Sequence, residues 1–129
     1  MKYFTVKELI YSATAKKYNI NNYPGLEELD ALHWLVSEIL DPARERLGEP
    51  IYVNSGFRCK ELNKKVGGVS DSQHIRGEAC DITCKDLEKL FNILSEMDFD
   101  QLIYYKSRGF IHVSYTMRRR NRNQIILKG

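Results

Sequence analysis

The chain has 129 residues, of which 43% are apolar and 29% charged, and its net charge is +3 at pH 7. This length suits one domain, residues 1–129, with a single core. No apolar run approaches the roughly 20 residues of a membrane-spanning helix, which excludes that class of membrane protein. The N-terminus lacks an apolar core with a small-residue cleavage site, so we expect a chain made in the cytoplasm without a signal peptide.

The N-terminal third reads as helical. Thr5 and Glu8 form a capping box, which predicts a helix that begins there and continues to about Tyr18. A loop with turn residues follows, up to Pro24-Gly25.

Apolar residues over Leu26–Leu47 then recur at spacings of three and four, which predicts an amphipathic helix of about six turns. Gly48 is placed to end this helix, and Pro42 within it predicts a kink or a break. His33 falls on or beside the apolar stripe, where we expect a packed histidine rather than a metal ligand.

The rest of the chain alternates short strands with two more helices. The pattern predicts strands at 51–53, 78–83, 101–105, 110–115 and 124–127, and helices at 60–66 and 86–97. Residues 107–109 read as a hairpin turn. The sequence therefore predicts an α+β fold, with helices packed on one face of a small, mostly antiparallel sheet.

His74 and Asp81 lie seven residues apart, on a loop and on the strand that follows it. His112 lies in an alternating segment that presents its imidazole on one face of a strand. Two imidazoles and one carboxylate are good Zn²⁺ ligands, and a catalytic zinc takes three protein ligands. On spacing alone this pattern is weak, since any two histidines and an aspartate can be grouped in this way.

Further motifs occur around these residues in a fixed order. They are Ser55-Gly56-Phe57-Arg58, Leu62-Asn63, Gly67-Gly68, the stretch Ser72 to Asp81, and Phe110-Ile111-His112-Val113. This series resembles the signature of the M15 zinc peptidases, and most closely the branch of D-Ala-D-Ala carboxypeptidases, murein endopeptidases and phage lysins. The resemblance covers nearly the whole chain and implies the fold that these peptidases share with the hedgehog signalling domain.

The resemblance also implies roles for individual residues. It implies a Zn²⁺ ion bound by His74, Asp81 and His112. It implies that Arg58 binds a carboxylate of the peptide substrate, for which a salt bridge within the fold is the alternative. Ser72 is expected close to the site, where it would help to bind substrate or orient a ligand.

A general base is harder to find. Many M15 peptidases carry an acidic residue or a histidine two or three positions before the last ligand, but here Phe110 and Gly109 occupy those positions. Asp100, at the start of the preceding strand, is the best remaining carboxylate, although it can equally cap that strand. Glu78 is expected on the opposite face from Asp81.

We therefore expect a monomeric zinc peptidase that cuts peptidoglycan stem peptides or cross-links. Without a signal peptide, a phage-encoded or virion-associated lysin that acts on the cell wall fits best. The alternative is a zinc-containing wall-binding module without catalysis. A third hypothesis, nucleic-acid binding through the arginines of 118–122, is not favoured, because a solvated strand end also accounts for them.

Three cysteines cannot all pair within one chain, so free thiols are expected. Cys80 reads as a small core residue, because it lies beside Asp81 and so points to the opposite face. Cys84 is expected near the end of its strand, and Cys59 near the metal site.

Overall fold

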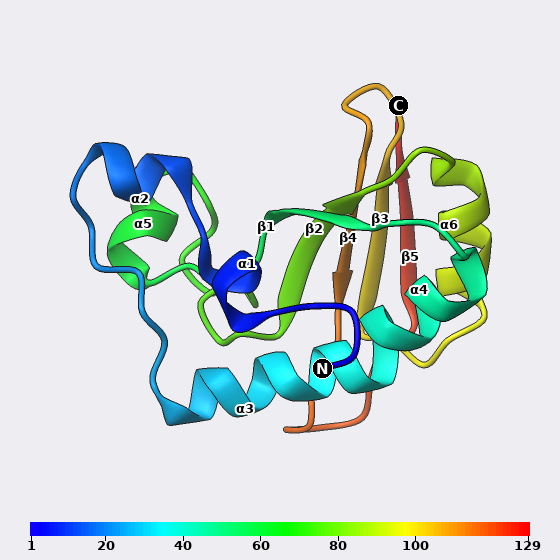
Figure 1. Ribbon diagram of the computed structural model, residues 1–129, viewed down its shortest axis with the longest axis horizontal. Helices are drawn as coiled ribbons and strands as arrows, with labels where there is room; N and C mark the ends of the chain where they lie inside the picture. Colours follow the sequence, from blue (N-terminus) through cyan, green and yellow to red (C-terminus); the bar gives the residue numbers. More distant parts are fainter.

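The computed structural model describes residues 1–129 and combines short helices with one five-stranded sheet (Figure 1). The helices are α1 (Val6–Ile10), α2 (Ala13–Lys17), α3 (Leu26–Leu35), α4 (Asp41–Leu47), α5 (Lys60–Lys65) and α6 (Leu87–Ser95), with a π-helical turn η1 (Val36–Leu40) between α3 and α4. The strands are β1 (Tyr52–Ser55), β2 (Ala79–Thr83), β3 (Gln101–Tyr105), β4 (Phe110–Ser114) and β5 (Gln124–Lys128).

The sheet has the strand order β1-β2-β4-β3-β5. Its neighbouring strands are antiparallel except β3 and β5, which are parallel. This confirms the predicted α+β fold with a mostly antiparallel sheet. No helix has both the length and the apolar character needed to cross a bilayer.

Strand alternation separates the core from the opposite face of the sheet. Twenty buried apolar residues from the helices and the sheet form one core cluster. Cys80 and Ile82 of β2 belong to this cluster, whereas Asp81 between them does not. Because successive side chains of a strand point to opposite faces, Asp81 is directed to the far face, and β4 repeats the pattern at His112.

The expected first helix is interrupted. The structure has two short helices in its place, because Tyr11 adopts an extended backbone conformation (φ −62°, ψ 135°). Ser12 then caps α2, with its Oγ accepting a hydrogen bond from the N–H of Ala15 at 3.1 Å. A serine at this position favours a new helix start over continuation of the first helix.

The Leu26–Leu47 segment is helical throughout but not regular. The N–H of Asp41 donates to the carbonyl of Val36, five residues earlier, immediately before Pro42. Proline has no N–H and its ring clashes with the carbonyl four residues earlier, so a wider turn accommodates it. The predicted irregularity at Pro42 is thus a π turn, and Gly48 ends the helix in the left-handed conformation (φ 73°) as expected.

His33 is exposed, and its ring contacts Trp34 edge to face, with the ring centroids 6.4 Å apart. The buried positions of α3 are Leu32 and Leu35. The prediction of a packed histidine is therefore wrong, because position 33 lies on the solvent side between two core positions.

Candidate metal centre

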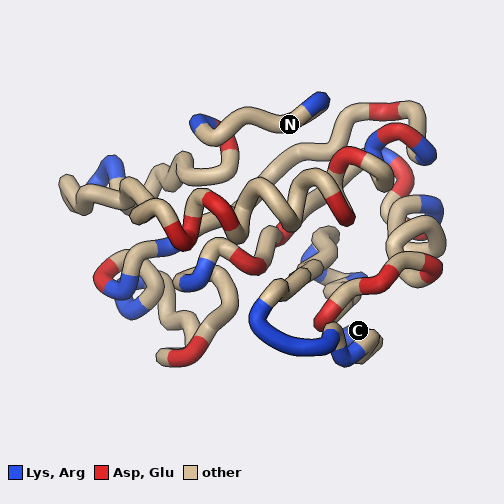
Figure 2. The backbone as a smooth tube through the Cα atoms, turned by 90° about the horizontal axis from the view of Figure 1, so that it is seen from below, with Lys and Arg blue, Asp and Glu red and all other residues tan.

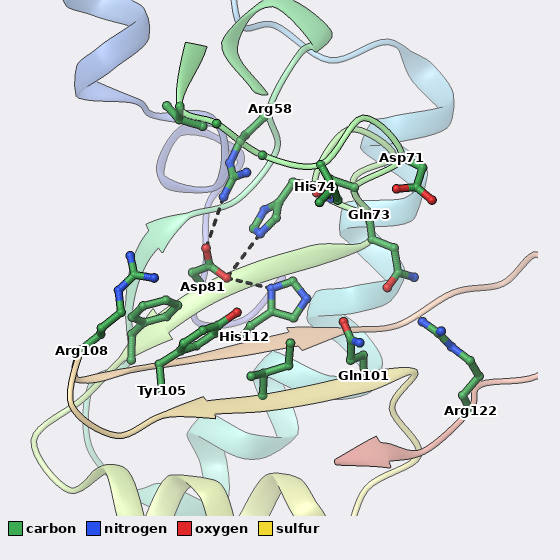
Figure 3. A pocket seen from close by; sticks show the side chains of 17 residues that line it. Arg58, Asp71, Gln73, His74, Asp81, Gln101, Tyr105, Arg108, His112 and Arg122 are labelled. Carbon is green, nitrogen blue, oxygen red and sulfur yellow. Dashed lines mark hydrogen bonds and ion pairs between the residues drawn. The ribbon is translucent and has the colours of Figure 1, made fainter. Parts of the chain in front are cut away.

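Three side chains converge on the face of the sheet opposite the core (Figure 3). Asp81 of β2 and His112 of β4 are direct partners in the antiparallel register, and His74 comes from the loop before β2. Asp81 Oδ1 lies 2.8 Å from His112 Nδ1 and 3.3 Å from His74 Nε2. The three possible ligand atoms all lie within 4.8 Å of one another. The structure thus brings together the three residues that the sequence singled out.

The His74 ring is fixed from behind. Its side chain is buried, and its Nδ1 lies 2.7 Å from the carbonyl oxygen of Gly56. Because a carbonyl can only accept, Nδ1 carries the proton and Nε2 presents its lone pair toward Asp81. The backbone is held as well, since the N–H of Arg58 donates to the His74 carbonyl at 3.1 Å.

Gly56 permits a close approach of two segments. The N–H of the next residue, Phe57, donates to the carbonyl of Leu9 at 2.8 Å. A Cβ atom at position 56 would lie 2.1 Å from that carbonyl oxygen. Only glycine therefore fits here, which explains its place in the Ser-Gly-Phe-Arg motif.

Arg58 connects the metal ligands to the surrounding loops. Its Nε donates to Ser55 at 3.0 Å, its Nη1 to Asn63 Oδ1 at 3.0 Å, and its Nη2 to Asp81 Oδ2 at 3.4 Å. A Cβ at Gly68 would lie 2.1 Å from the Asn63 oxygen and 2.9 Å from Arg58 Nη1. The second glycine of the Gly-Gly pair therefore leaves room for this bonded group.

The electrostatics keep Asp81 ionised. Burial alone would raise its pKa, but the hydrogen bond from His112 and the adjacent His74 imidazole outweigh burial and leave the pKa below its ordinary value. Ligand atoms about 2.0 Å from a tetrahedral zinc ion are about 3.3 Å apart, which equals the distance from Asp81 Oδ1 to His74 Nε2 and exceeds the 2.8 Å to His112 Nδ1. Two imidazoles and one ionised carboxylate therefore fit a zinc ion, with three protein donors as in catalytic sites.

Ser72 lies at the edge of this group. It lines the pocket of about 550 Å³ that contains the three ligands and Arg58. Its Oγ accepts a hydrogen bond from the backbone N–H of His74 at 3.1 Å. Its contact within the protein thus positions the His74 loop.

The structure does not bring Asp100 to the metal centre. Asp100 is 0% exposed and is not among the residues that line the pocket. Both its oxygens are bonded, at 2.7 Å and 3.2 Å by Arg119 and at 3.1 Å and 2.9 Å by Arg122. Burial raises its pKa, but these hydrogen bonds outweigh that effect and lower it. Asp100 thus serves as an ion-pair anchor for the segment that leads into β5.

The C-terminal arginines are largely engaged within the fold. The run 118–120 is the long blue arch in Figure 2. Arg118 forms a two-pronged pair with buried Glu78, at 2.8 Å and 2.9 Å, and Arg119 and Arg122 hold Asp100. Three of the four arginines therefore have a structural role, as partners of buried carboxylates.

The structure records all three cysteines as free thiols. Cys80 is buried in the core, as predicted, and burial raises its pKa. Cys59 caps α5, where its sulfur accepts from the N–H of Leu62 at 3.4 Å. The cluster of possible ligands contains no cysteine.

Sequence reasoning missed several pocket residues, among them Asp71, Gln101, Tyr105 and Arg108. For the strand residues the signal was present. Alternation along β3 and β4 places Tyr105 and Phe110 on the same face as His112.

Comparison with known proteins points to a peptidase family. The family model described as peptidase M15 matches residues 2–114. Over 44 residues the chain is 46% identical to a zinc D-Ala-D-Ala carboxypeptidase of Streptomyces albus G, a stretch that covers 33% of this chain and only 17% of that protein. Because the family match extends over most of its length, the chain belongs to the peptidase M15 family.

Proposed function

We propose that this protein is a zinc-dependent peptidase that cleaves peptide bonds in peptidoglycan stem peptides or cross-links, as a carboxypeptidase or an endopeptidase. The observation that carries the proposal is the convergence of His74, Asp81 and His112 in one pocket of a peptidase M15 chain. The partial match to a D-Ala-D-Ala carboxypeptidase supports a wall peptide as substrate.

In this proposal His74, Asp81 and His112 hold the zinc ion. When bound, the ion would lower the pKa of a water molecule and polarise the scissile carbonyl. The Gly56 carbonyl keeps His74 in the tautomer that can bind metal. Arg58 keeps the second oxygen of Asp81 in place.

Arg58 and Ser72 line the pocket, and we propose that both contact substrate. A guanidinium has five N–H donors, and Arg58 uses three of them inside the protein. Two N–H donors remain, one on Nη1 and one on Nη2, and they can bond a substrate oxygen. The Ser72 hydroxyl accepts from His74 and can donate its own proton to the peptide.

Asp71 is the one carboxylate besides Asp81 among the residues that line the pocket. It is exposed and lies on the loop before His74, to one side of the three ligands in Figure 3. We propose Asp71 as the proton acceptor, since a general base must reach the attacking water directly or through one further water. Its replacement by Asn should lower kcat and leave zinc content unchanged.

The alternative is a wall-binding module that holds zinc without cleavage. One observation favours it: Phe110 and Gly109 precede His112 where a base is common in this family, and Asp100 is bonded elsewhere. The effect of Asp71→Asn on kcat therefore distinguishes the peptidase from the binding module.

The first experiment combines elemental analysis of the purified protein with digestion of peptidoglycan and mass spectrometry of the released peptides. We expect one zinc per chain and new peptide termini, both lost in Asp81→Ala. Asp98→Ala, which removes an exposed carboxylate that does not line the pocket, is the matched control. Full lysis by Asp81→Ala would refute the peptidase, and zinc without cleavage of any wall type would favour the binding module.

The biological setting we propose is a phage lysin or a virion-associated enzyme. Purified protein added from outside to susceptible cells, and separately to isolated sacculi, tests this proposal. Cleavage of sacculi of one wall type identifies the target bond and the host group.

A further inference from the structure

Arg108 differs from the other arginines of the pocket in having no partner that bonds its guanidinium. Arg58 is bonded to Ser55, Asn63 and Asp81, and Arg122 is bonded to Asp100. Arg108 forms no hydrogen bond or ion pair within the protein, and its side chain is exposed. It therefore retains all five N–H donors of its guanidinium for a ligand.

Two aromatic rings hold the Arg108 guanidinium in place. Its central carbon lies 5.0 Å from the ring centroid of Phe110 and 5.5 Å from that of Tyr105. These rings are stacked on each other, with centroids 4.5 Å apart and planes at 17°. Cation–π contact limits the freedom of the side chain and leaves the N–H edge available for two parallel hydrogen bonds.

The turn that carries Arg108 is anchored as well. The N–H of Gly109 donates to the Tyr105 carbonyl at 2.9 Å, which closes the β3–β4 turn. The hydroxyl of Thr83 in β2 donates to the Gly109 carbonyl, also at 2.9 Å. Arg108 is thus presented from a fixed hairpin rather than from a free loop.

The position of Arg108 relates it to the metal centre. It lines the same pocket as the three metal ligands, and together with Asn54, Asp81 and Phe110 it lines a smaller adjoining hollow. In Figure 3 it lies at one end of the pocket and Arg122 at the other, with Asp81 and His112 between them. A peptide held across the metal centre would therefore extend toward Arg108.

We propose that Arg108 binds a carboxylate of the peptide substrate in a two-pronged contact, and so selects acidic over amidated stem peptides. The inference rests on the proposed function for the identity of the ligand. The carboxylate has two sources in a stem peptide, the terminal D-Ala and the D-Glu residue.

The test measures binding by zinc-loaded protein of the tetrapeptide L-Ala-D-Glu-L-Lys-D-Ala, by calorimetry. Two further probes carry an amide in place of one carboxylate each, at the terminal D-Ala or at D-Glu. Arg108→Met should weaken binding of the free peptide by about 10- to 100-fold, as expected for a lost charge-assisted contact. Binding of the amide that lacks the recognised carboxylate should not change.

The matched control is Lys106→Met. Lys106 belongs to the same turn and is exposed, but its ammonium lies over Tyr104, a core residue on the other face. This variant loses the same charge and should bind all three probes like the wild type. Arg108→Lys should recover only part of the affinity, because a lysine retains the charge without the planar fork.

The amide that wild-type protein binds more weakly identifies the source of the carboxylate. The proposal would be overturned if wild type and Arg108→Met distinguished the free peptide from its amides equally well. It would also be overturned if the wild-type protein bound none of the probes. Because binding is read without cleavage, this outcome is distinct from failure of the peptidase itself, which shows as absence of zinc or of new termini.

Discussion

The Nδ1 atom of His74 and the carbonyl oxygen of Gly56 lie 2.7 Å apart, 18 residues from each other in the chain. This bond joins the turn after β1 to the loop before β2. It also fixes which imidazole nitrogen can bind a metal ion. Whatever moves the Gly56 carbonyl therefore moves a metal ligand.

Gly56→Ala should weaken zinc binding although position 56 supplies no metal ligand. The added Cβ would lie 2.1 Å from the Leu9 carbonyl, so one of the two segments must shift. We expect a loss of about 2–4 kcal/mol in the free energy of unfolding and weaker zinc binding, measured by chemical denaturation and metal competition. In the control Gly25→Ala the Cβ meets only the end of the flexible Glu28 side chain at 2.7 Å. If both variants lost the same stability and zinc affinity, the close approach of Gly56 to Leu9 would not be what holds the metal centre in place.

Arg58→Met should lower zinc affinity as well as substrate affinity. The change removes the bond to Asp81 and the bonds to Ser55 and Asn63. Loss of a group that orients a ligand costs about 10- to 100-fold in metal affinity, which competition with a chelator measures. Arg76→Met, at an exposed arginine outside this pocket, is the control. Unchanged zinc affinity would limit Arg58 to substrate contact.

Asp100→Asn should separate a structural role from a catalytic one. The change removes the charge that holds Arg119 and Arg122, and we expect a loss of about 2–3 kcal/mol in stability. Zinc content and kcat of the folded protein should be retained. A severe fall in kcat with normal stability would restore Asp100 as a candidate base.

The same carboxylate predicts an acid-dependent stability. The folded-state pKa of Asp100 lies below its ordinary value, mainly because the Arg122 and Arg119 hydrogen bonds outweigh burial. Such a group stabilises the fold above its unfolded pKa of about 4, and that contribution is lost as pH falls through the lower folded value. The stability difference between wild type and Asp100→Asn, from denaturation at several pH values, should be largest near neutrality and shrink below about pH 4. A difference independent of pH would contradict this.

Cys80 should resist thiol reagents in the native protein. It is fully buried, and burial raises its pKa, so little thiolate forms and reagents have no access. A chromogenic disulfide reagent should modify Cys80 only after unfolding, while the partly exposed Cys59 reacts first. Cys80→Ala identifies the protected thiol, and rapid reaction at Cys80 would show that β2 opens readily.

Local patterns predicted the strands well, because alternation along one segment determines which side chains face the core. The three proposed metal ligands came from the family resemblance, since their spacing alone was a weak signal. Asp81 and His112 lie on the face opposite the residues that their strands give to the core cluster, which are Cys80, Ile82, Ile111 and Val113, and this alternation is visible in the sequence. The role of Asp100 was not predictable, because its partners Arg119 and Arg122 come from a crossing segment. The prediction for His33 failed for a different reason: spacing locates an apolar stripe only to within one position, and position 33 lies between the buried Leu32 and Leu35.

The pairing of β2 with β4 has a consequence for folding. Asp81 and His112 are exact partners in this pair, although 31 residues separate them. A slip of one residue would turn one of them into the core and bring Cys80 or Val113 to the other face. An ion that binds both ligands therefore stabilises only the native register, and closure of this long loop must precede its binding. Metal uptake thus reports the moment at which the centre of the sheet is correctly aligned.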